Sequence, residues 1–346
     1  MFDPMALLAL PFEEGAIPTP ARADGAPAPV PCLRARPSPA LRPELFACEQ
    51  GAKPDHDALA AQGAEVTARF DPEPTGAPAA AVALTRSKAE NRANIARAWA
   101  MVAPGGYVLL AGAKTDGVES LQKELRKLVD LAGVEPRNHG RVIWMQRGED
   151  TPAPFAAWIA EAARAPRVEE AGRAWTTEAG LFSWTEPDPG SQLLAPWIGG
   201  LSGRVADLGA GWGYLAPAVL ASEKVAALDL HEAEAAGLDC ARAALDDPRV
   251  SFHWTDVAAP GALPARTYDH VVSNPPFHAG RNVALHLGEA FLAAAAAALK
   301  PSGTFWMVAN QQLPYERELE ARFGIVETLE RTTRYKVFKA RKPRKS

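Results

Sequence analysis

The stretch that decides the fold is Asp207-Leu208-Gly209-Ala210-Gly211-Trp212-Gly213. It follows the apolar run at residues 205–206 and precedes a helical pattern at residues 214–221, so it connects a buried strand to a helix. Its three glycines let the backbone turn tightly and approach a ligand without Cβ atoms in the way. This pattern is typical of an α/β sheet that binds a nucleotide-like cofactor at the carboxyl ends of its strands.

Strand and helix patterns alternate on both sides of this loop. Strands are predicted at residues 45–48, 80–84, 107–112, 142–145, 205–208, 225–229, 250–253, 268–273, 303–310 and 334–339. Helices are predicted at residues 55–62, 88–101, 118–132, 214–221, 232–245 and 287–299. Residues 11–43 hold nine prolines and are expected to be irregular. We therefore predict two tandem α/β domains with mostly parallel sheets, of which only the second has a glycine loop.

Size and composition fit a protein of two domains. The chain has 346 residues, of which 47% are hydrophobic and 23% charged, and it has no apolar run long enough to span a membrane. We predict a first domain at residues 1–150, a linker at 151–174 and a second domain at 175–346. The cysteines at positions 32, 48 and 240 form no CxxC pair or zinc set, so we expect reduced thiols, a cytoplasmic location and no metal.

The acidic residue that opens the loop argues against a bound pyrophosphate and favours a cationic cofactor without phosphates. Asp229 lies 22 residues after Asp207, at the predicted end of the next strand, where a carboxylate accepts hydrogen bonds from ribose hydroxyls. Asp256 follows another strand and is a candidate for the adenine amino group. The residues expected to hold the cofactor are Asp207, Gly209, Gly211, Gly213, Asp229, Asp256 and Asn274.

The segment Ser273-Asn274-Pro275-Pro276-Phe277-His278 has the features of a grip for a planar amino group. The side chain of Asn274 offers a carbonyl oxygen that accepts an N–H of the amine. Pro275 removes a backbone donor, restricts Asn274 to extended geometry and leaves a carbonyl free to accept. Pro276 stiffens the next bond, and Phe277 offers a face on which a base can stack. We assign the catalytic role to Asn274, Pro275, Pro276 and Phe277.

Both motifs fall at carboxyl ends of predicted strands, so they are expected to meet at one sheet edge. Together they indicate methyl transfer from S-adenosylmethionine to a nitrogen on a base. Such a reaction needs positioning and in-line attack rather than a strong general base, because the nitrogen's proton becomes acidic after the transfer.

With these motifs, the chain resembles the bacterial small-subunit (16S) ribosomal RNA guanine-N2 methyltransferases of the two-domain type. The resemblance rests on residues 180–183, 188–194, 207–213, 274–278 and 334–337, and more weakly on 87–88, 104–106 and 112–120. It implies two tandem class I methyltransferase folds, the first degenerate and without a cofactor loop. It also implies S-adenosylmethionine as cofactor and guanine as substrate. The substrate-binding residues we expect are Phe182, Ser191, Phe277, His278, Arg334 and Lys336.

Net charge is −4, so RNA binding requires positive charge to be concentrated locally. The last 16 residues hold eight basic residues and no acid: Arg331, Arg334, Lys336, Lys339, Arg341, Lys342, Arg344 and Lys345. The first half offers Arg86, Lys88, Arg92, Arg97, Lys114, Lys123, Arg126 and Lys127. We predict that the first domain and the tail hold ribosomal RNA or the small ribosomal subunit, and that the protein is a monomer.

Two alternatives stay open from the sequence. The first is a methyltransferase of the same fold that acts on another amino group, either adenine N6 or a protein glutamine amide. Glutamine enzymes more often carry Tyr after the prolines and have a small helical partner domain, which argues against the glutamine amide. A non-catalytic RNA-binding or assembly protein is the second alternative, and the intact loop and Asn-Pro-Pro segment argue against it.

Overall fold

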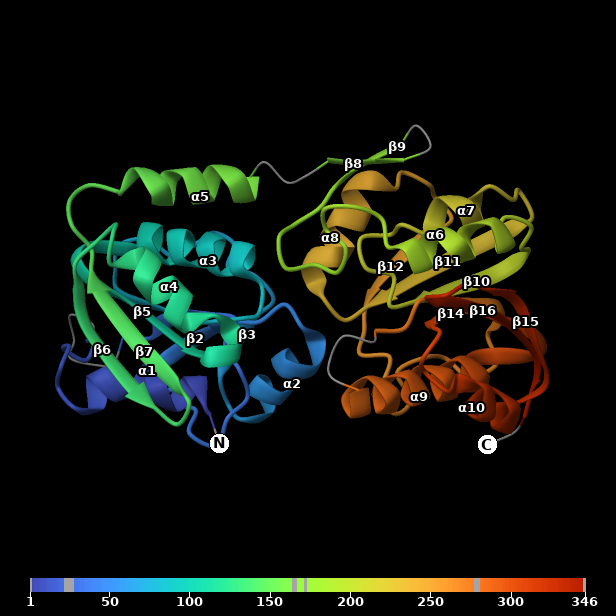
Figure 1. The fold of residues 1–346 in the computed structure, drawn as a ribbon, viewed down its shortest axis with the longest axis horizontal. Coiled ribbons are helices and arrows are strands. Elements are labelled where there is room, and N and C mark those ends of the chain that lie inside the picture. The colour runs from blue at the N-terminus through green and yellow to red at the C-terminus, as the bar shows by residue number, and fades with distance from the viewer. Residues whose placement is uncertain (1, 22–27, 164–166, 171–172, 277–280, 345–346) are drawn as a thin grey trace. The chain divides into compact units, whose positions relative to one another are not determined.

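Two seven-stranded sheets organise the chain, one in each half (Figure 1). The structure is a computed structural model that describes residues 2–21, 28–163, 167–170, 173–276 and 281–344. The chain separates into two units, Met1–Ala165 and Pro166–Ser346. No helix among the described residues is long and apolar enough to cross a membrane.

The first sheet has the order β3-β2-β1-β4-β5-β7-β6. Its strands are β1 (Val30–Leu33), β2 (Phe46–Glu49), β3 (Glu65–Thr67), β4 (Ala77–Ala83), β5 (Val102–Ala113), β6 (Leu131–Arg137) and β7 (Gly140–Gln146). Strands β1 to β5 pair in parallel, whereas β7 runs antiparallel to β5 and to the edge strand β6. The central strands are buried because helices cover both faces of the sheet.

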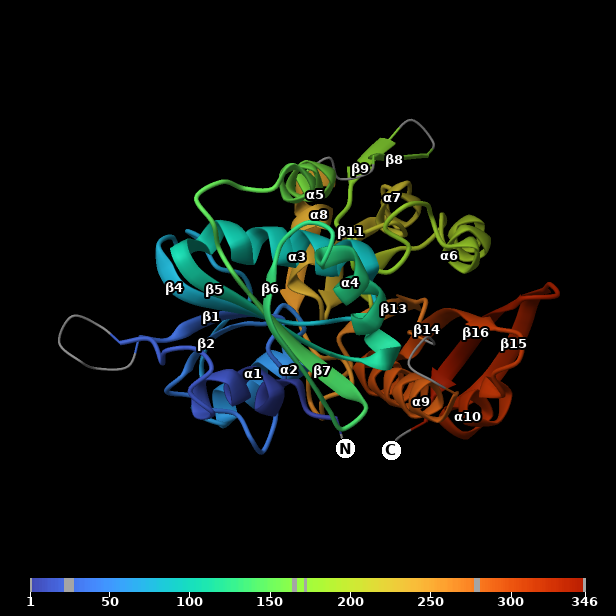
Figure 2. The same cartoon turned by 60° about the vertical axis from the view of Figure 1, so that its left-hand side comes forward.

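The helices of the first unit divide between the two faces of its sheet. They are α1 (Pro4–Glu13), α2 (Lys53–Ala61), α3 (Lys88–Met101), the 3₁₀ helix η1 (Lys114–Asp116), α4 (Val118–Leu125) and α5 (Ala153–Ala163). Helices α1 and α2 lie on one face and α3, α4 and α5 on the other (Figure 2). Each group packs its apolar side chains against its own face of the sheet. The linker expected at residues 151–174 is thus divided, because Phe155 of α5 lies in the first core and contacts Trp99 of α3 at 5.0 Å between ring centroids.

The second sheet repeats the order of the first, β12-β11-β10-β13-β14-β16-β15. Its strands are β10 (Gly203–Leu208), β11 (Val225–Glu232), β12 (Val250–Trp254), β13 (Tyr268–Ser273), β14 (Leu299–Asn310), β15 (Phe323–Arg331) and β16 (Tyr335–Pro343). Helices α6 (Pro189–Leu194), η2 (Ala195–Trp197), α7 (Ala216–Leu220) and α8 (Ala235–Ala244) pack on one face, and α9 (Arg281–Ala298) and α10 (Tyr315–Arg322) on the other. A small hairpin, β8 (Arg167–Glu170) and β9 (Arg173–Thr176), precedes them.

The two halves also share a bend in the backbone. Strand β10 ends in Leu208, and Gly209 after it has a φ of +73°. Strand β1 occupies the same place in the first sheet, ends in Leu33, and is followed by Arg34 with a φ of +57°. The first half therefore keeps the turn but has no glycine loop. The predicted tandem α/β architecture, with a cofactor loop only in the second half, is confirmed.

Candidate functional site

The glycine loop leaves β10 at the carboxyl edge of the second sheet. Gly209, Gly211 and Gly213 all have positive φ, between +56° and +85°, which side chains rarely adopt. A Cβ on Gly211 would meet nothing within 4 Å, so this part of the loop is open to a ligand. A Cβ on Gly213 would approach Ala241 of α8 at 3.1 Å, so Gly213 serves helix packing as well as the turn.

Asp207 is the buried acid beneath this loop. Its side chain is 1% exposed, and neither carboxylate oxygen has a hydrogen-bond partner among the described residues. Burial, reinforced by the charge of Glu232, raises its pKa to about 8. A buried carboxylate without donors is costly unless a cation or donor reaches it. A donor or cation bound beneath the loop would therefore stabilise the charged form of Asp207.

Glu232 occupies the strand end that we had assigned to Asp229. It is the last residue of β11, and its Oε2 accepts a 2.7 Å hydrogen bond from the backbone N–H of Gly211. Its Oε1 accepts from the N–H of Glu234 at 2.8 Å. Burial raises the pKa of Glu232. The sequence prediction ended this strand three residues early, at its first acid, although Leu-His-Glu continues it.

Asp229 lies in the middle of β11, level with Ala206 rather than with the loop. Its Oδ2 accepts hydrogen bonds from the Arg204 guanidinium at 2.7 and 2.9 Å and from the Tyr268 hydroxyl at 2.9 Å. Burial alone would raise the pKa of Asp229, but these hydrogen bonds outweigh it and hold the pKa below the usual value. The expected cofactor role of Asp229 is therefore corrected to one in the core of the sheet.

Two histidines extend this network. His231 and His253 are neighbours on β11 and β12, and with Asp229 they bring possible metal-ligand atoms within 4.8 Å of one another. Their rings are stacked, with centroids 4.6 Å apart and planes inclined by 16°. A metal ion lies in the plane of each imidazole that binds it, and planes inclined by only 16° intersect far from both rings, so the two imidazoles do not converge on one ion. As arranged, His231 joins the hydrogen-bonded network through the Tyr268 hydroxyl at 3.1 Å, His253 stacks on His231, and Arg204 supplies the cation that faces Asp229.

Asp256 lies beyond the end of β12, as predicted, in the loop after Thr255. Its Oδ1 accepts a hydrogen bond from the N–H of Ala258 at 2.9 Å, which closes a local turn. Strand β12 is the edge strand of this sheet, and β11 lies between it and β10, the strand that leads into the glycine loop.

Asn274 stands directly beside the glycine loop. Ser273 at the end of β13 pairs with Leu208 at the end of β10, and its hydroxyl donates to the Leu208 carbonyl at 2.8 Å. The amide of Asn274 donates to Oδ2 of Asp188 at 2.9 Å and to the Ser191 hydroxyl at 2.8 Å. Its carbonyl oxygen, Oδ1, is buried and has no partner among the described residues. The structure thus holds an acceptor beside the loop.

Pro275 is buried and Pro276 is exposed, so the chain reaches the surface immediately after Pro275. The expected stacking residue Phe277 and the candidate His278 lie outside the described residues.

Phe182, Ser191 and Asn274 line one cleft with the glycine loop. The cleft has about 400 Å³ of empty space, including space open to solvent, and its walls also include Asp188 and Trp212. Phe182 is 45% exposed on its rim. The indole N–H of Trp212 donates to the Phe182 carbonyl at 3.1 Å, and this links the loop to the segment before the sheet.

Trp212 is otherwise part of a small aromatic cluster. Its ring lies 5.4 Å from Trp175 of β9 and 5.5 Å from Tyr214, centroid to centroid. This support was not predicted: most of the β8–β9 hairpin falls in the stretch that we had assigned to the linker, and Trp175 is the first residue after that stretch.

Arg334 and Lys336 have different environments. Arg334 is exposed, and its guanidinium lies 5.4 Å from the ring centroid of Tyr335. Lys336 is 3% exposed, and its Nζ donates to the Leu313 carbonyl at 3.0 Å and to Glu316 at 2.6 Å. The predicted substrate contact of Lys336 is therefore wrong, since its ammonium is already held inside the protein.

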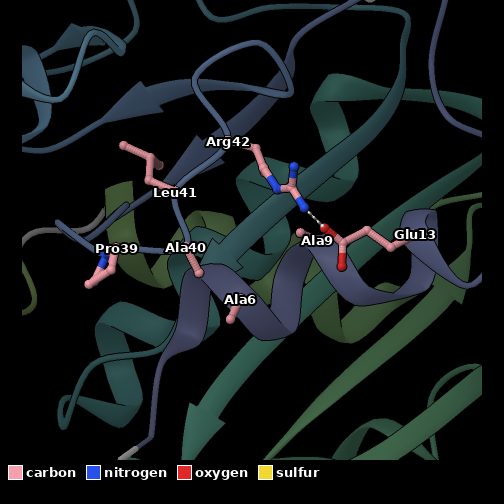
Figure 3. Close-up of a pocket in the computed structure, with 7 residues that line it drawn as sticks. All are labelled: Ala6, Ala9, Glu13, Pro39, Ala40, Leu41 and Arg42. Atoms are coloured by element: carbon pink, nitrogen blue, oxygen red, sulfur yellow. Dashed lines mark hydrogen bonds and ion pairs between the residues drawn. The ribbon is translucent and has the colours of Figure 1, made fainter.

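Another hollow, with about 590 Å³ of empty space that also includes space open to solvent, lies in the first unit between α1 and residues 39–42 (Figure 3). Arg42 and Glu13 form an ion pair across it at 2.5 Å, and alanines line much of the rest. Its two charged side chains pair with each other, so we place the functional site in the cleft of the second unit that Asn274 and the glycine loop line.

Comparison with known proteins agrees with this location. Residues 173–339 match the family model of the methyltransferase small domain. The ribosomal RNA small subunit methyltransferase C of Shewanella pealeana is 30% identical over 240 residues, which are 68% of this chain and 69% of the relative. The protein of the same name from Alteromonas mediterranea is 29% identical over 267 residues, 75% and 72% of the two chains.

Among solved structures, similarity extends over both halves. The T. thermophilus 16S rRNA N2 G1207 methyltransferase (RsmC), solved in complex with AdoMet and guanosine, matches with a TM-score of 0.75 and 26% identity. The match covers 98% of this chain and 92% of that one. The predicted pair of tandem methyltransferase folds is thus confirmed.

Proposed function

The chain belongs to the ribosomal RNA small subunit methyltransferase C family, and from this premise we propose that it methylates N2 of a guanosine in small-subunit ribosomal RNA, with S-adenosylmethionine as the methyl donor. The observation that carries the proposal is the buried, unpartnered Oδ1 of Asn274 in the cleft that it shares with the glycine loop. A hydrogen-bond acceptor beside a cofactor loop is what an amine substrate requires.

The residues of the loop suit this cofactor. Asp207 offers two unpartnered oxygens to a cationic group, and Gly211 leaves open space for a close approach of the ligand. Glu232 takes the ribose role that we first gave to Asp229, because it ends β11 and already contacts the loop. S-adenosylmethionine, when bound, supplies an electrophilic methyl group on its sulfonium sulfur.

Asn274 activates the amine by accepting a hydrogen bond from it. The lone pair of an exocyclic amine is delocalised into the base, so the nitrogen is a weak nucleophile. When Oδ1 of Asn274 accepts one of its N–H groups, the nitrogen becomes more pyramidal and its lone pair more available. Phe182 on the rim and Phe277 are the candidates for stacking on the base, which contributes on the order of 1–3 kcal/mol.

One exposed cation of the second unit, Arg334, supports an RNA substrate, since it precedes Tyr335, which pairs with Asn310 at the carboxyl end of β14. Several cations of the first unit are occupied, since Arg97 pairs with Glu49 at 2.8 Å, and Lys88 with Glu124 at 3.3 Å. RNA binding by the first unit stays a prediction, as do the monomeric state and the absence of a metal. Ribosomal RNA as substrate implies action in the cytoplasm.

The test uses the full chain, methyl-labelled S-adenosylmethionine and small ribosomal subunits from a strain that lacks methyltransferase C. We expect label in N2-methylguanosine when the RNA is digested and analysed by mass spectrometry. Asn274→Ala should abolish transfer while leaving cofactor binding nearly unchanged. Label in N6-methyladenosine, or in protein, would replace the proposal with one of the alternatives, and binding of RNA without transfer would support a non-catalytic role.

A further inference from the structure

Asp188 fixes which way the amide of Asn274 faces. It is 7% exposed, and its Oδ2 accepts from the Asn274 amide nitrogen and from the backbone N–H of Ser191, both at 2.9 Å. The Ser191 hydroxyl, at 2.8 Å, accepts the second amide hydrogen. An amide with two acceptors at its nitrogen cannot turn over without bringing its oxygen against a carboxylate. The acceptor Oδ1 of Asn274 is therefore held away from Asp188.

The second carboxylate oxygen of Asp188 remains available. All hydrogen bonds to this carboxylate from the described residues end on Oδ2. Asp188 lines the same cleft as Asn274 and the glycine loop. The cleft thus presents two acceptors on side chains that are hydrogen-bonded to each other, Oδ1 of Asn274 and Oδ1 of Asp188.

Two such acceptors match one base edge in particular. The Watson–Crick edge of guanine carries the N1–H donor beside the N2 amino donor. Adenine and cytosine instead carry a ring-nitrogen acceptor beside their amino group. Such a lone pair would face the carboxylate and repel it, and a buried polar group left unpaired is strongly disfavoured.

Resting on the function proposed above, we propose that Asp188 is both the positioning residue of Asn274 and the residue that selects guanine, by accepting a hydrogen bond from N1–H while Asn274 accepts one from N2. By binding N1–H, the Asp188 carboxylate also fixes the position of N2 relative to Asn274, because N1 and N2 belong to the same rigid base. Ser191 contributes only to the positioning, through Asn274.

The test compares guanosine with 2-aminopurine riboside, which keeps the 2-amino group but has a lone pair at N1. Binding is measured by calorimetry to the full chain in the presence of S-adenosylhomocysteine. The wild type should prefer guanosine by about tenfold or more. Asp188→Asn should abolish or reverse this preference, because an asparagine amide can donate to the N1 lone pair. Asparagine also remains a good N-cap for α6, so the fold is kept.

Two further variants separate selection from structure. Ser191→Ala removes the other holder of the Asn274 amide, so it should lower the rate of methyl transfer but keep the preference for guanosine. Asp3→Asn makes the same change at the N-cap of α1, where Asp3 accepts from the N–H groups of Met5 and Ala6, and should leave the preference unchanged.

The outcomes distinguish this inference from the function on which it rests. If the wild type binds guanosine no better than 2-aminopurine riboside, or if Asp188→Asn keeps the wild-type ratio, Asp188 does not select the base. If the wild type transfers no methyl group to guanosine N2 in small ribosomal subunits, the proposed function itself fails.

Discussion

The backbone N–H of Gly211 donates a 2.7 Å hydrogen bond to Oε2 of Glu232. This bond joins the middle of the glycine loop to the end of the neighbouring strand, so the loop and the acid that we assign to the ribose are held as one unit. Asp229, three residues earlier, has a different set of partners.

Glu232→Gln should weaken cofactor binding while preserving the fold. Glutamine can still accept from Gly211, but it loses the charge and one acceptor. A hydrogen bond to a charged group contributes about 1.5–3 kcal/mol, so the Kd for S-adenosylmethionine should rise about tenfold or more. Calorimetry measures this directly. An unchanged Kd would remove Glu232 from the cofactor site.

Asp229→Ala should act on stability instead. It leaves the buried Tyr268 hydroxyl and the partly exposed Arg204 guanidinium without their shared acceptor, and we expect a loss of about 2 kcal/mol or more in the free energy of unfolding. Arg204→Ala should cost less, because the Arg204 side chain is 46% exposed. Urea denaturation compares the two. A large change in cofactor Kd with unchanged stability would restore Asp229 to the cofactor site.

Asp207 should make cofactor binding depend on pH. Its pKa of about 8 in the free protein means that the carboxyl is mostly protonated at pH 7. A cationic group bound beside it lowers this pKa, so binding releases a proton and affinity rises with pH up to about 8, by at most about tenfold per unit. Calorimetry in buffers of different ionisation enthalpy counts the protons. Asp207→Asn should reduce the release at pH 7 by close to one proton.

The same shift predicts a trend in stability. The folded pKa of Asp207 lies above its unfolded value of 3.8, so the folded state binds more protons between these values. Its contribution to stability is present below pH 4 and is lost as the pH rises to 8. In the absence of cofactor, Asp207→Asn should therefore gain stability relative to the wild type over that interval. A constant difference in unfolding free energy would contradict the raised pKa.

Arg334 and Lys336 should respond in opposite ways to substitution. Arg334→Ala should weaken RNA binding and reduce the slope of affinity against salt by about one. Lys336→Met should leave RNA affinity unchanged and destabilise the protein by about 1–3 kcal/mol, because the buried Leu313 carbonyl loses its donor. Arg242→Ala, an equal loss of charge on α8, is the control. Fluorescence anisotropy over a salt series measures binding. Equal effects of Arg334→Ala and Arg242→Ala would exclude a specific contact.

Local signals in the sequence were sufficient where they agreed with tertiary packing. Helix α3 has both of the boundaries that were predicted, and in the structure Ser87 caps its start, where its side chain accepts from the N–H of Glu90. The placement of Asn274 beside the loop followed from a general property of parallel sheets, whose carboxyl ends share an edge.

Other elements were not predicted, because their residue composition is atypical of a strand or a helix. Strand β1 was missed because Pro31 and its proline-rich surroundings indicated irregular structure, and α1 because it contains Pro11. Only the first two residues of β6 were covered by a prediction, as the end of the helix expected at residues 118–132, and the antiparallel pairing with β7 is what identifies this strand. Cys32 and Cys48 are 16 residues apart in sequence yet directly opposite on β1 and β2, a pairing that spacing alone does not indicate.

Arg34, with its φ of +57°, bears on how such architectures are compared. A left-handed arginine costs roughly 1–2 kcal/mol where glycine would cost almost nothing, and its guanidinium is held by Glu90 at 2.8 Å. When the two halves are aligned by sequence, arginine against glycine counts as a mismatch. The backbone torsion angles at Arg34 and Gly209 nevertheless agree, so a comparison of backbone conformation detects a similarity between the two halves that a comparison of residue types misses.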